Sequence, residues 1–269
     1  MKNNAKSDRK IVAVIGIALL VAGITQTSRG DGVRVFADKS KFTKIDVPGA
    51  AGRTEPFGIN SRGDIVGHYF DVLNNNLITR GFLLSKGTFT NIDVDLPGAV
   101  PGSTNAVGIN PRGDIVGYYA SDNGNIEDGF LLRKGTFTTV LAPGSTFTVA
   151  FGINPQGDIV GFYIDSSGNL HGFLLSRGTF TNIDVDLPGA APGSTIPNGI
   201  NPEGDIVGSY TDSGGNFHGF LLSKGKFVTI DVPGGFGIGT VAFGINPQGD
   251  IVGSYSDGSG NVHGFLLSK

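Results

Sequence analysis

The sequence predicts an all-β protein, a five-bladed β-propeller built from four-stranded antiparallel blades. One unit of about 45 residues recurs five times along the chain. Each unit holds four short apolar segments separated by turn residues. Glycine is abundant, at 45 of 269 residues, and charged residues make up only 16%. Together these observations favour tightly turned β structure over helix or disorder.

The repeat is defined by Gly-Ile-Asn, two variable residues and Gly-Asp-Ile-Val-Gly. The tripeptide begins at five glycines: Gly58, Gly108, Gly152, Gly199 and Gly244. The first predicted strand ends in Gly-Ile-Asn, and a turn such as Pro-Gln-Gly at 155–157 leads to the second, Asp-Ile-Val-Gly-x-Tyr. The third strand contains Gly-Phe-Leu-Leu, and a Lys-Gly pair turns the chain into the fourth, Phe-Thr-x-Ile-Asp-Val.

The phase of the repeat predicts how the domain closes. It begins at 42–47 with a fourth strand that lacks its first three, and it ends at 264–269 with a third strand that lacks its fourth. We expect the N-terminal strand to pair with the C-terminal blade, which closes the ring and leaves no open edge. A β-helix is the alternative fold, but a solenoid would need distinct polar caps at its ends.

A different composition marks the first 29 residues. Four cationic residues precede an apolar run over residues 11–24, and a polar stretch follows. This three-part pattern is typical of an export signal. We therefore expect a signal peptide at 1–29, a polar lead-in at 30–41, and a propeller domain at 42–269 that is secreted to the extracellular space or the periplasm. An uncleaved membrane anchor is the alternative, although the run is shorter than the roughly 20 residues of a spanning helix.

Charge and cysteine content exclude several classes of protein. The chain has no cysteine, which excludes a disulfide framework, a thiolate metal site and a lipid anchor on cysteine. The net charge is -3, and beyond the N-terminus no basic stripe indicates a nucleic-acid partner. No phosphate-binding loop is present, and we expect no cofactor.

The string Gly-Ile-Asn-Pro-x-Gly-Asp-Ile-Val-Gly, followed by His-Gly-Phe-Leu-Leu, resembles the repeat of the bacterial extracellular HAF-family proteins. The resemblance spans residues 42–269. Glycine replaces the alanine of the family's His-Ala-Phe, and Arg80 and Asp128 stand where two repeats would carry the histidine. The resemblance implies export and a repeat architecture, and it carries over no functional residue.

One aromatic position recurs at the end of the predicted second strand. It is occupied by Tyr69, Tyr119, Tyr163, Tyr210 and Tyr255. In three repeats the loop that follows supplies one Asp and one Asn, which are Asp165, Asp212, Asp257, Asn169, Asn216 and Asn261. An aromatic ring beside carboxylate and amide groups suits a sugar, which binds by stacking and directed hydrogen bonds. A tyrosine packed between blades would give the same pattern, and the absence of tryptophan weakens the lectin interpretation.

No metal site is predicted. His171, His218 and His263 share one repeat position, but copies on separate blades should lie more than about 10 Å apart, too far to share one zinc ion. The Asp/Asn loops offer too few oxygens for calcium. We expect the aspartates that follow the turn glycine to accept a backbone N–H and fix the hairpin. They are Asp64, Asp114, Asp158, Asp205 and Asp250.

Catalysis would require acidic residues that break the fivefold pattern, and these are Glu55, Glu127, Asp128 and Glu203. Only Glu55 falls near an inner strand, so no pair is expected to meet and no catalytic residue is predicted. We expect a secreted, non-catalytic, multivalent module that binds extracellular or envelope glycans. A polysaccharide-acting glycoside hydrolase on the same scaffold and a structural surface or matrix protein are the alternatives.

Overall fold

The computed structural model describes residues 43–122 and 127–269, of which Lys44–Lys269 belong to one compact unit. The predicted signal peptide at 1–29 and lead-in at 30–41 lie outside the described residues. In the described part of the chain, no helix is long and apolar enough to cross a membrane.

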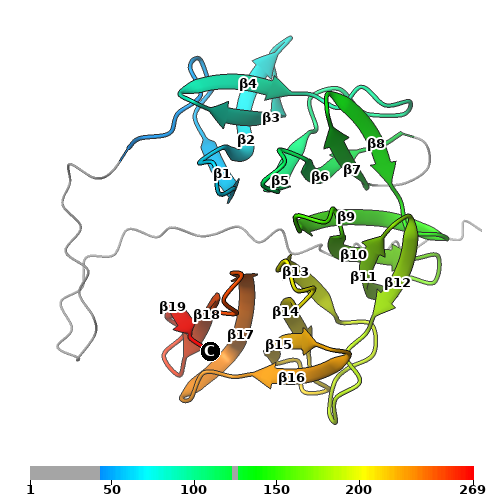
Figure 1. Cartoon of the computed structure of the whole chain (residues 1–269), viewed down its shortest axis with the longest axis vertical. Coiled ribbons are helices and arrows are strands. Elements are labelled where there is room, and N and C mark those ends of the chain that lie inside the picture. The colour runs from blue at the N-terminus through cyan, green and yellow to red at the C-terminus, as the bar shows by residue number, and fades with distance from the viewer. Residues whose placement is uncertain (1–42, 123–126) are drawn as a thin grey trace, which may run out of the picture. The chain divides into compact units, whose positions relative to one another are not determined.

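In the described residues nineteen strands form five consecutive antiparallel sheets, the fourth and fifth of which are joined by one parallel pair, Phe217 with Gly239 (Figure 1). The first contains β1 (Thr54–Ile59), β2 (Ile65–Leu73), β3 (Asn76–Ser85) and β4 (Thr88–Ile92). The second contains β5 (Asn105–Ile109), β6 (Ile115–Ala120), β7 (Glu127–Arg133) and β8 (Thr136–Val140). The third contains β9 (Ser145–Ile153), β10 (Ile159–Asp165), β11 (Leu170–Ser176) and β12 (Thr179–Ile183). The fourth contains β13 (Ile196–Ile200), β14 (Ile206–Thr211), β15 (Phe217–Ser223) and β16 (Lys226–Ile230). The fifth contains β17 (Gly235–Ile245), β18 (Ile251–Asp257) and β19 (Val262–Leu267).

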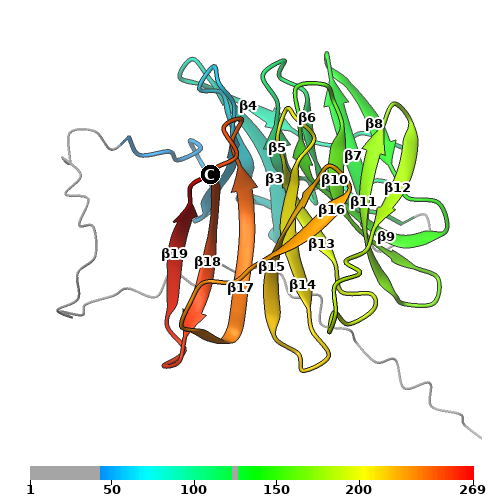
Figure 2. The ribbon, with the colours of Figure 1, turned by 60° about the horizontal axis from the view of Figure 1, so that its bottom comes forward.

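Within each sheet the strands follow chain order and pair antiparallel, as the repeat predicts. The long hairpins of the fourth and fifth sheets are visible in Figure 2. The turns between third and fourth strands place a cationic residue and then glycine in the left-handed region, with φ of 50° at Lys86 and 79° at Gly87. Two consecutive positive φ values are typical of a type I′ hairpin turn. The alternative of a β-helix is therefore wrong. Its repeats would pair through continuous parallel strands, whereas only single parallel bridges join the described sheets. The chain is all-β, and its four-stranded sheets resemble propeller blades.

Neighbouring sheets pack through the valine of Ile-Val-Gly. Val66 of the first sheet is fully buried against Ala106 and Phe130 of the second, and Val116 of the second is buried against Ala150 and Phe173 of the third. The same contact recurs between the third and fourth sheets and between the fourth and fifth. The hydrophobic core is thus a series of layers between sheets.

The Gly-Ile-Asn tripeptide joins the inner strands. At Gly108 a Cβ atom would lie 2.5 Å from the carbonyl oxygen of Phe151 in the next sheet, so no side chain fits there. Asn110 donates from Nδ2 to Asp114 at 3.0 Å and to the Asn154 carbonyl of the next sheet at 3.1 Å. Its Oδ1 accepts the Asp114 N–H at 3.0 Å. One asparagine therefore fixes its own turn and reaches the neighbouring sheet.

The aspartates of these turns act differently from the prediction. Their backbone N–H groups are bound by the asparagine, and their carboxylates accept side-chain donors; of the five, Asp250 also accepts a backbone N–H, from Lys269 at 3.4 Å. Asp64 accepts from Asn60 at 3.0 Å, from Arg62 at 2.9 Å and from Ser85 at 2.5 Å. These three donors, Ser85 first, lower the pKa of Asp64 to about 2.

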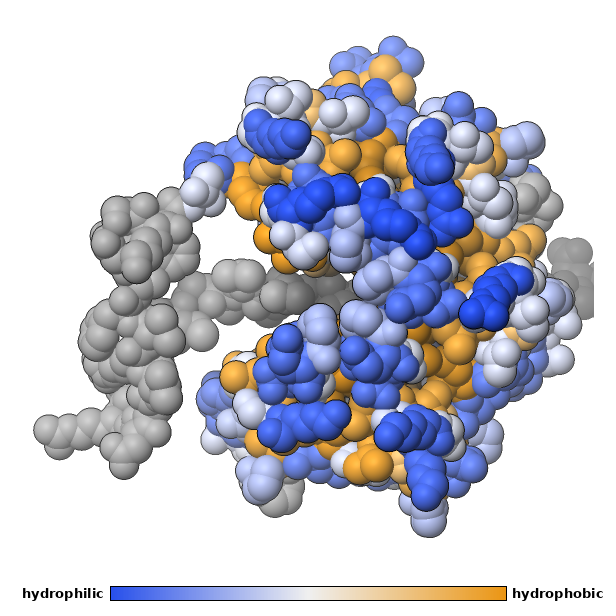
Figure 3. Space-filling view, in the orientation of Figure 1, coloured by the Kyte–Doolittle hydropathy of each residue, from blue (hydrophilic) through white to orange (hydrophobic). Residues whose placement is uncertain are grey.

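The predicted ring closure is not formed between the described residues. Residues 43–47 have no strand assignment, and β19 pairs with β18 alone. Val252 is 50% exposed and Leu266 is 66% exposed, although the valines at the same repeat position in the other four sheets are fully buried. Apolar surface also lies between the hydrophilic patches of the sheets in Figure 3. Closure of the ring stays a prediction.

Candidate binding site

The loops between the second and third strands of the last three sheets share one structure. Asp165 Oδ1 accepts the backbone N–H groups of Ser167 and Asn169, both at 2.8 Å, and Asn169 Nδ2 donates to Asp165 Oδ2 at 3.0 Å. The loops at Asp212 and Asp257 repeat these bonds. The bonds from Asn169, backbone first, lower the pKa of Asp165 to about 2. Each loop therefore holds a carboxylate and an amide in fixed orientation.

A histidine in each of these sheets lies beside the loop aspartate. His218 Nδ1 is 2.9 Å from Asp231 and its Nε2 is 3.3 Å from Asp212. Burial lowers the pKa of His218, but hydrogen bonds to Asp231 and Asp212 outweigh burial, so the net direction is upward. The side chain is 24% exposed. The imidazole thus bridges two carboxylates at the surface.

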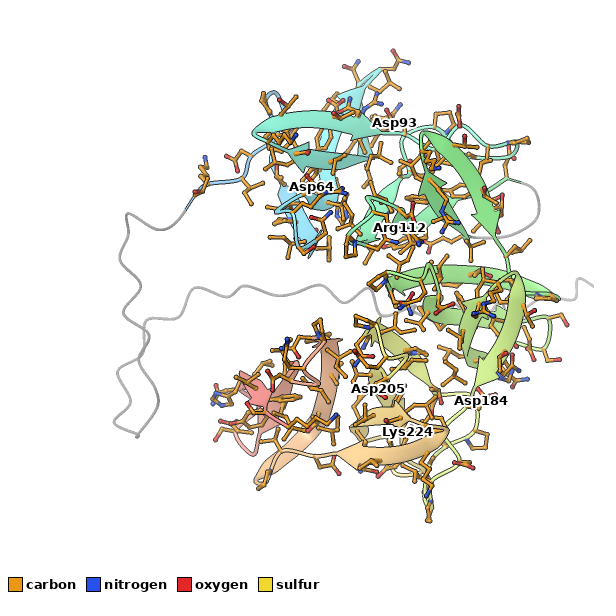
Figure 4. The ribbon with its side chains drawn as sticks, in the orientation of Figure 1. Asp64, Asp93, Arg112, Asp184, Asp205 and Lys224 are labelled. Carbon is orange, nitrogen blue, oxygen red and sulfur yellow. The ribbon has the colours of Figure 1, made fainter. Side chains whose placement is uncertain are left out.

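The contact between the histidine and its two carboxylates differs from sheet to sheet. His171 repeats it in the third sheet, with Nδ1 3.1 Å from Asp184 and Nε2 3.5 Å from Asp165. In the fifth sheet, His263 Nε2 lies 3.0 Å from Asp257. Arg80 replaces the histidine in the first sheet and bonds Asp71 at 2.9 Å and Asp93 at 2.5 Å. Figure 4 shows Asp93 and Asp184 beside the outer strands of their sheets.

The tyrosines lie inside the sheets rather than at the surface. Four of the five are buried, and only Tyr255 is partly exposed. The Tyr210 ring stacks on His218 with centroids 5.2 Å apart, and its hydroxyl is 3.0 Å from Thr229. Tyr163 stacks in the same way on His171. The expected open aromatic plate is therefore absent at the four buried positions, because neighbouring side chains cover these rings, and the alternative of packing describes them.

The acidic residues that break the repeat lie on three sheets, and two of them, Glu127 and Glu55, act with burial, the largest cause, to raise the pKa of the half-buried Tyr118. Glu203 is exposed in a turn, and Asp128 is buried on β7. Glu127 starts β7, and burial raises its pKa to about 7. Glu55 on β1 contacts His68 at 2.9 Å and also pairs with Arg53. Sequence reasoning missed His68 and Arg53, although both break the fivefold pattern, and the strand register places His68 opposite Glu55.

The cations of the described residues are shared unevenly between the two edges of the sheets. At the edge of the Asp/Asn loops the described cations are Lys44, Arg53 and Arg80, and each is paired with a carboxylate. The other edge holds the turns that carry Arg62, Arg112, Lys86, Lys134, Arg177 and Lys224.

In the described residues no group of three or more His, Asp or Glu side chains is placed to hold a metal ion.

No family model and no curated protein matches the chain. Among solved structures it is similar to the fucose-specific lectin of Aleuria aurantia, at 14% identity and a TM-score of 0.47, over 78% of this chain and 72% of the lectin. A mutant of the Arthrobotrys oligospora protein AofleA is 15% identical with a TM-score of 0.46, over 78% of this chain and 67% of that one. The propeller domain of the Pyrococcus furiosus Trilobed protease is 9% identical with a TM-score of 0.42, over 80% and 81%.

These likenesses are distant. The Aleuria aurantia lectin is a six-bladed propeller, whereas the described part of this chain holds five sheets. In a complex of that lectin with a fucoside, the chain spans 55% of the lectin's length. No residue is carried over from these proteins, and the chain is structurally similar to β-propellers.

Proposed function

We propose that this protein is a secreted, non-catalytic propeller that binds extracellular or envelope glycans at the edge carrying the Asp/Asn loops. One observation supports this above the others: the same group of loop Asp, loop Asn and neighbouring His recurs in three sheets at partly exposed positions, and in two of them the His bridges to a second Asp. The resemblance of its repeat to the HAF family agrees with export and remains part of the proposal.

The chemistry of the group suits hydroxyl ligands. Asp184 and Asp231 are 43% and 50% exposed, and both can accept hydrogen bonds while the histidine holds them in place. The imidazole stacks on tyrosine behind it, which limits its movement. Because this edge is rich in carboxylates, a neutral or cationic sugar fits better than an anionic one. Several weak copies on one chain would gain affinity by multivalency.

Ring closure would complete the fifth copy. Asp46 occupies the same repeat position as Asp93, Asp184 and Asp231, so pairing of residues 42–47 with β19 would bring it to His263. The entry to the first sheet already resembles the other connections, since the Val47 N–H donates to Thr54 Oγ1 at 3.1 Å as the Val94 N–H does to Thr104 at 3.0 Å. We include the closed five-bladed ring in the proposal.

A pair of glycine variants tests closure. Gly108→Ala should lower the free energy of unfolding by about 1–3 kcal/mol, because the new methyl group meets the next inner strand. At Gly244 a Cβ atom would lie 3.6 Å from Val252 and meet no neighbouring sheet. In a closed ring Gly244→Ala should cost about as much as Gly108→Ala. Nearly unchanged stability of Gly244→Ala in urea unfolding would refute closure.

The binding proposal is tested on a glycan array with the double variant Asp184→Asn/Asp231→Asn. Each substitution removes one carboxylate that holds a histidine, so binding should fall while the fold survives. The matched control is Asp95→Asn/Asp186→Asn, which removes two exposed charges from equivalent loops and should leave binding intact. Equal binding by both variants would contradict the proposed site, and a blank array for the wild type would favour a structural surface role.

A polysaccharide hydrolase is a second candidate, and one observation favours it. Burial raises the pKa of Glu127 to about 7, as a general acid of glycoside hydrolysis requires. Release of reducing sugar from soluble polysaccharides, abolished by Glu127→Gln, would support this function. Activity that survives the substitution would remove Glu127 from it.

A further inference from the structure

The first sheet carries a pair of side chains without a counterpart in the other four. Glu55 on β1 lies opposite His68 on β2 in the strand register. The matching pairs are Asn105 and Tyr118, Val149 and Phe162, Ile196 and Ser209, and Val241 and Ser254. Because the third sheet fills this position with Val149 and Phe162, the fold does not require an acid and a base here.

The pair belongs to a connected group. His68 Nε2 lies 2.9 Å from Glu55 Oε2, and Arg53 pairs with the other oxygen of that carboxylate. The Arg53 guanidinium lies 5.7 Å from the centroid of the Phe70 ring. Phe57 stacks on His68 with centroids 5.2 Å apart, and Phe70 meets the imidazole edge-on at 5.9 Å. We call Arg53, Glu55, Phe57, His68 and Phe70 the first-sheet cluster.

Part of the first-sheet cluster is unfavourable for stability. His68 is only 9% exposed, and its Nδ1 atom is buried without a hydrogen-bond partner among the described residues. An unpaired buried polar atom is destabilising. Burial lowers the pKa of His68 although Glu55 opposes the change, so the folded chain favours the neutral imidazole. An unfavourable arrangement that the repeat does not need is typical of a functional position.

Three members of the first-sheet cluster are exposed enough to contact a ligand, and their chemistry indicates its class. Phe57 is 51% exposed, and the side chains of Arg53 and Glu55 are 62% and 27% exposed. We propose that Arg53, Glu55 and Phe57 form a second saccharide site, one per chain and separate from the repeated loops, which binds the ring of a neutral sugar. This inference rests on the proposed glycan function.

The site combines three contacts that a sugar ring uses. The open face of Phe57 packs against ring C–H groups, Glu55 accepts hydrogen bonds from hydroxyls, and Arg53 donates to hydroxyl oxygens. The charges of Arg53 and Glu55 cancel, so the site selects neither an anion nor a cation. The tyrosine position of the repeat offers no such open ring in the four sheets where it is buried.

The test uses the full-length chain and methyl glycosides of glucose, galactose, mannose, fucose, xylose and N-acetylglucosamine. Saturation-transfer NMR identifies the probes that bind, and calorimetry gives their affinities. Phe57→Ala and Glu55→Gln should each weaken at least one probe tenfold or more. The matched control is Phe243→Ala, at the same repeat position in the fifth sheet and 37% exposed, which should leave that affinity unchanged.

Two further measurements separate the outcomes. In the wild type, that probe should also shift the His68 imidazole resonances. Full affinity of Phe57→Ala and Glu55→Gln, with loss only in Asp184→Asn/Asp231→Asn, would overturn this site and leave the proposed function standing. Equal loss in Phe243→Ala would overturn it too, and a wild type that binds no probe would overturn both. If Phe57→Ala fails to fold by circular dichroism, Glu55→Gln decides, since glutamine keeps the shape and polarity of the side chain.

Discussion

Replacing Glu127 with Gln should remove a pH dependence of stability near neutrality. Burial raises the pKa of this carboxyl from 4.5 to about 7. The folded chain therefore holds the proton more tightly than the unfolded chain does. The free energy of unfolding should be highest below pH 4.5, fall as the pH rises towards 7, and stay level above that.

The size of the effect follows from the pKa. At about 1.4 kcal/mol for each tenfold change in proton affinity, the upper limit is about 3.5 kcal/mol. Glu127 is only partly buried, and screening by solvent reduces the expected difference to about 1–2 kcal/mol. Glutamine keeps the size and removes the charge, so Glu127→Gln should match the wild type at pH 4 and exceed its stability at pH 8 by that amount.

Urea unfolding between pH 4 and pH 8 measures this difference. The chain has no tryptophan, so circular dichroism or tyrosine fluorescence reports unfolding. Glu203→Gln serves as the control, because Glu203 is exposed in a turn and its substitution should give a curve parallel to the wild type. Parallel curves for Glu127→Gln and wild type over the whole range would show that Glu127 ionises normally and would refute the reasoning.

Three further predictions concern the framework. Phe130→Ala, at a fully buried ring, should cost about 3–5 kcal/mol in urea unfolding; a cost below about 1 kcal/mol would contradict the core assignment. Asn110→Ala should cost about 2 kcal/mol or more, because it removes hydrogen bonds to Asp114 and to the next sheet, whereas exposed Asn76→Ala should be neutral. Ser85→Ala should raise the pKa of Asp64 from about 2 towards its usual value and so move acid unfolding to higher pH, since this carboxylate stabilises the fold above its unfolded pKa and loses that effect as pH falls through the folded one; an unchanged acid midpoint would argue against the bond.

The strands and turns could be predicted from sequence because short motifs within each repeat mark where each strand ends. The Gly-Ile-Asn tripeptide, the Pro-x-Gly turn and the Lys-Gly turn fix where strands end, and five copies remove the ambiguity of one. The surroundings of each side chain were harder to predict. Tyr210 ends a strand, as expected, but its burial depends on which face the next sheet covers, and a single repeat does not contain that information.

The histidine bridge illustrates a signal that was present and unused. His171 and Asp184 are thirteen residues apart, and the Gly172–Ile183 pairing of β11 and β12 brings them together. The turn at Arg177–Gly178 sets that register, so the contact follows from hairpin geometry. Glu55 and His68 required more, because their pairing passes a bulge between Pro56 and Gly58 that the sequence does not mark.

The asparagine contacts between inner strands have a consequence for how the molecule opens. Asn60 donates to the Asn110 carbonyl at 3.2 Å and Asn110 to that of Asn154 at 3.1 Å, so each of the first two sheets is bonded to the sheet that follows. In such a series the stability of each sheet depends on its contacts with the sheets next to it. A unit with partners on both sides exchanges its amide hydrogens slowly, whereas one with a single partner frays first. In a closed ring the amide hydrogens of β18 and β19 should therefore exchange as slowly as those of β10 and β11. In an open array they should exchange faster.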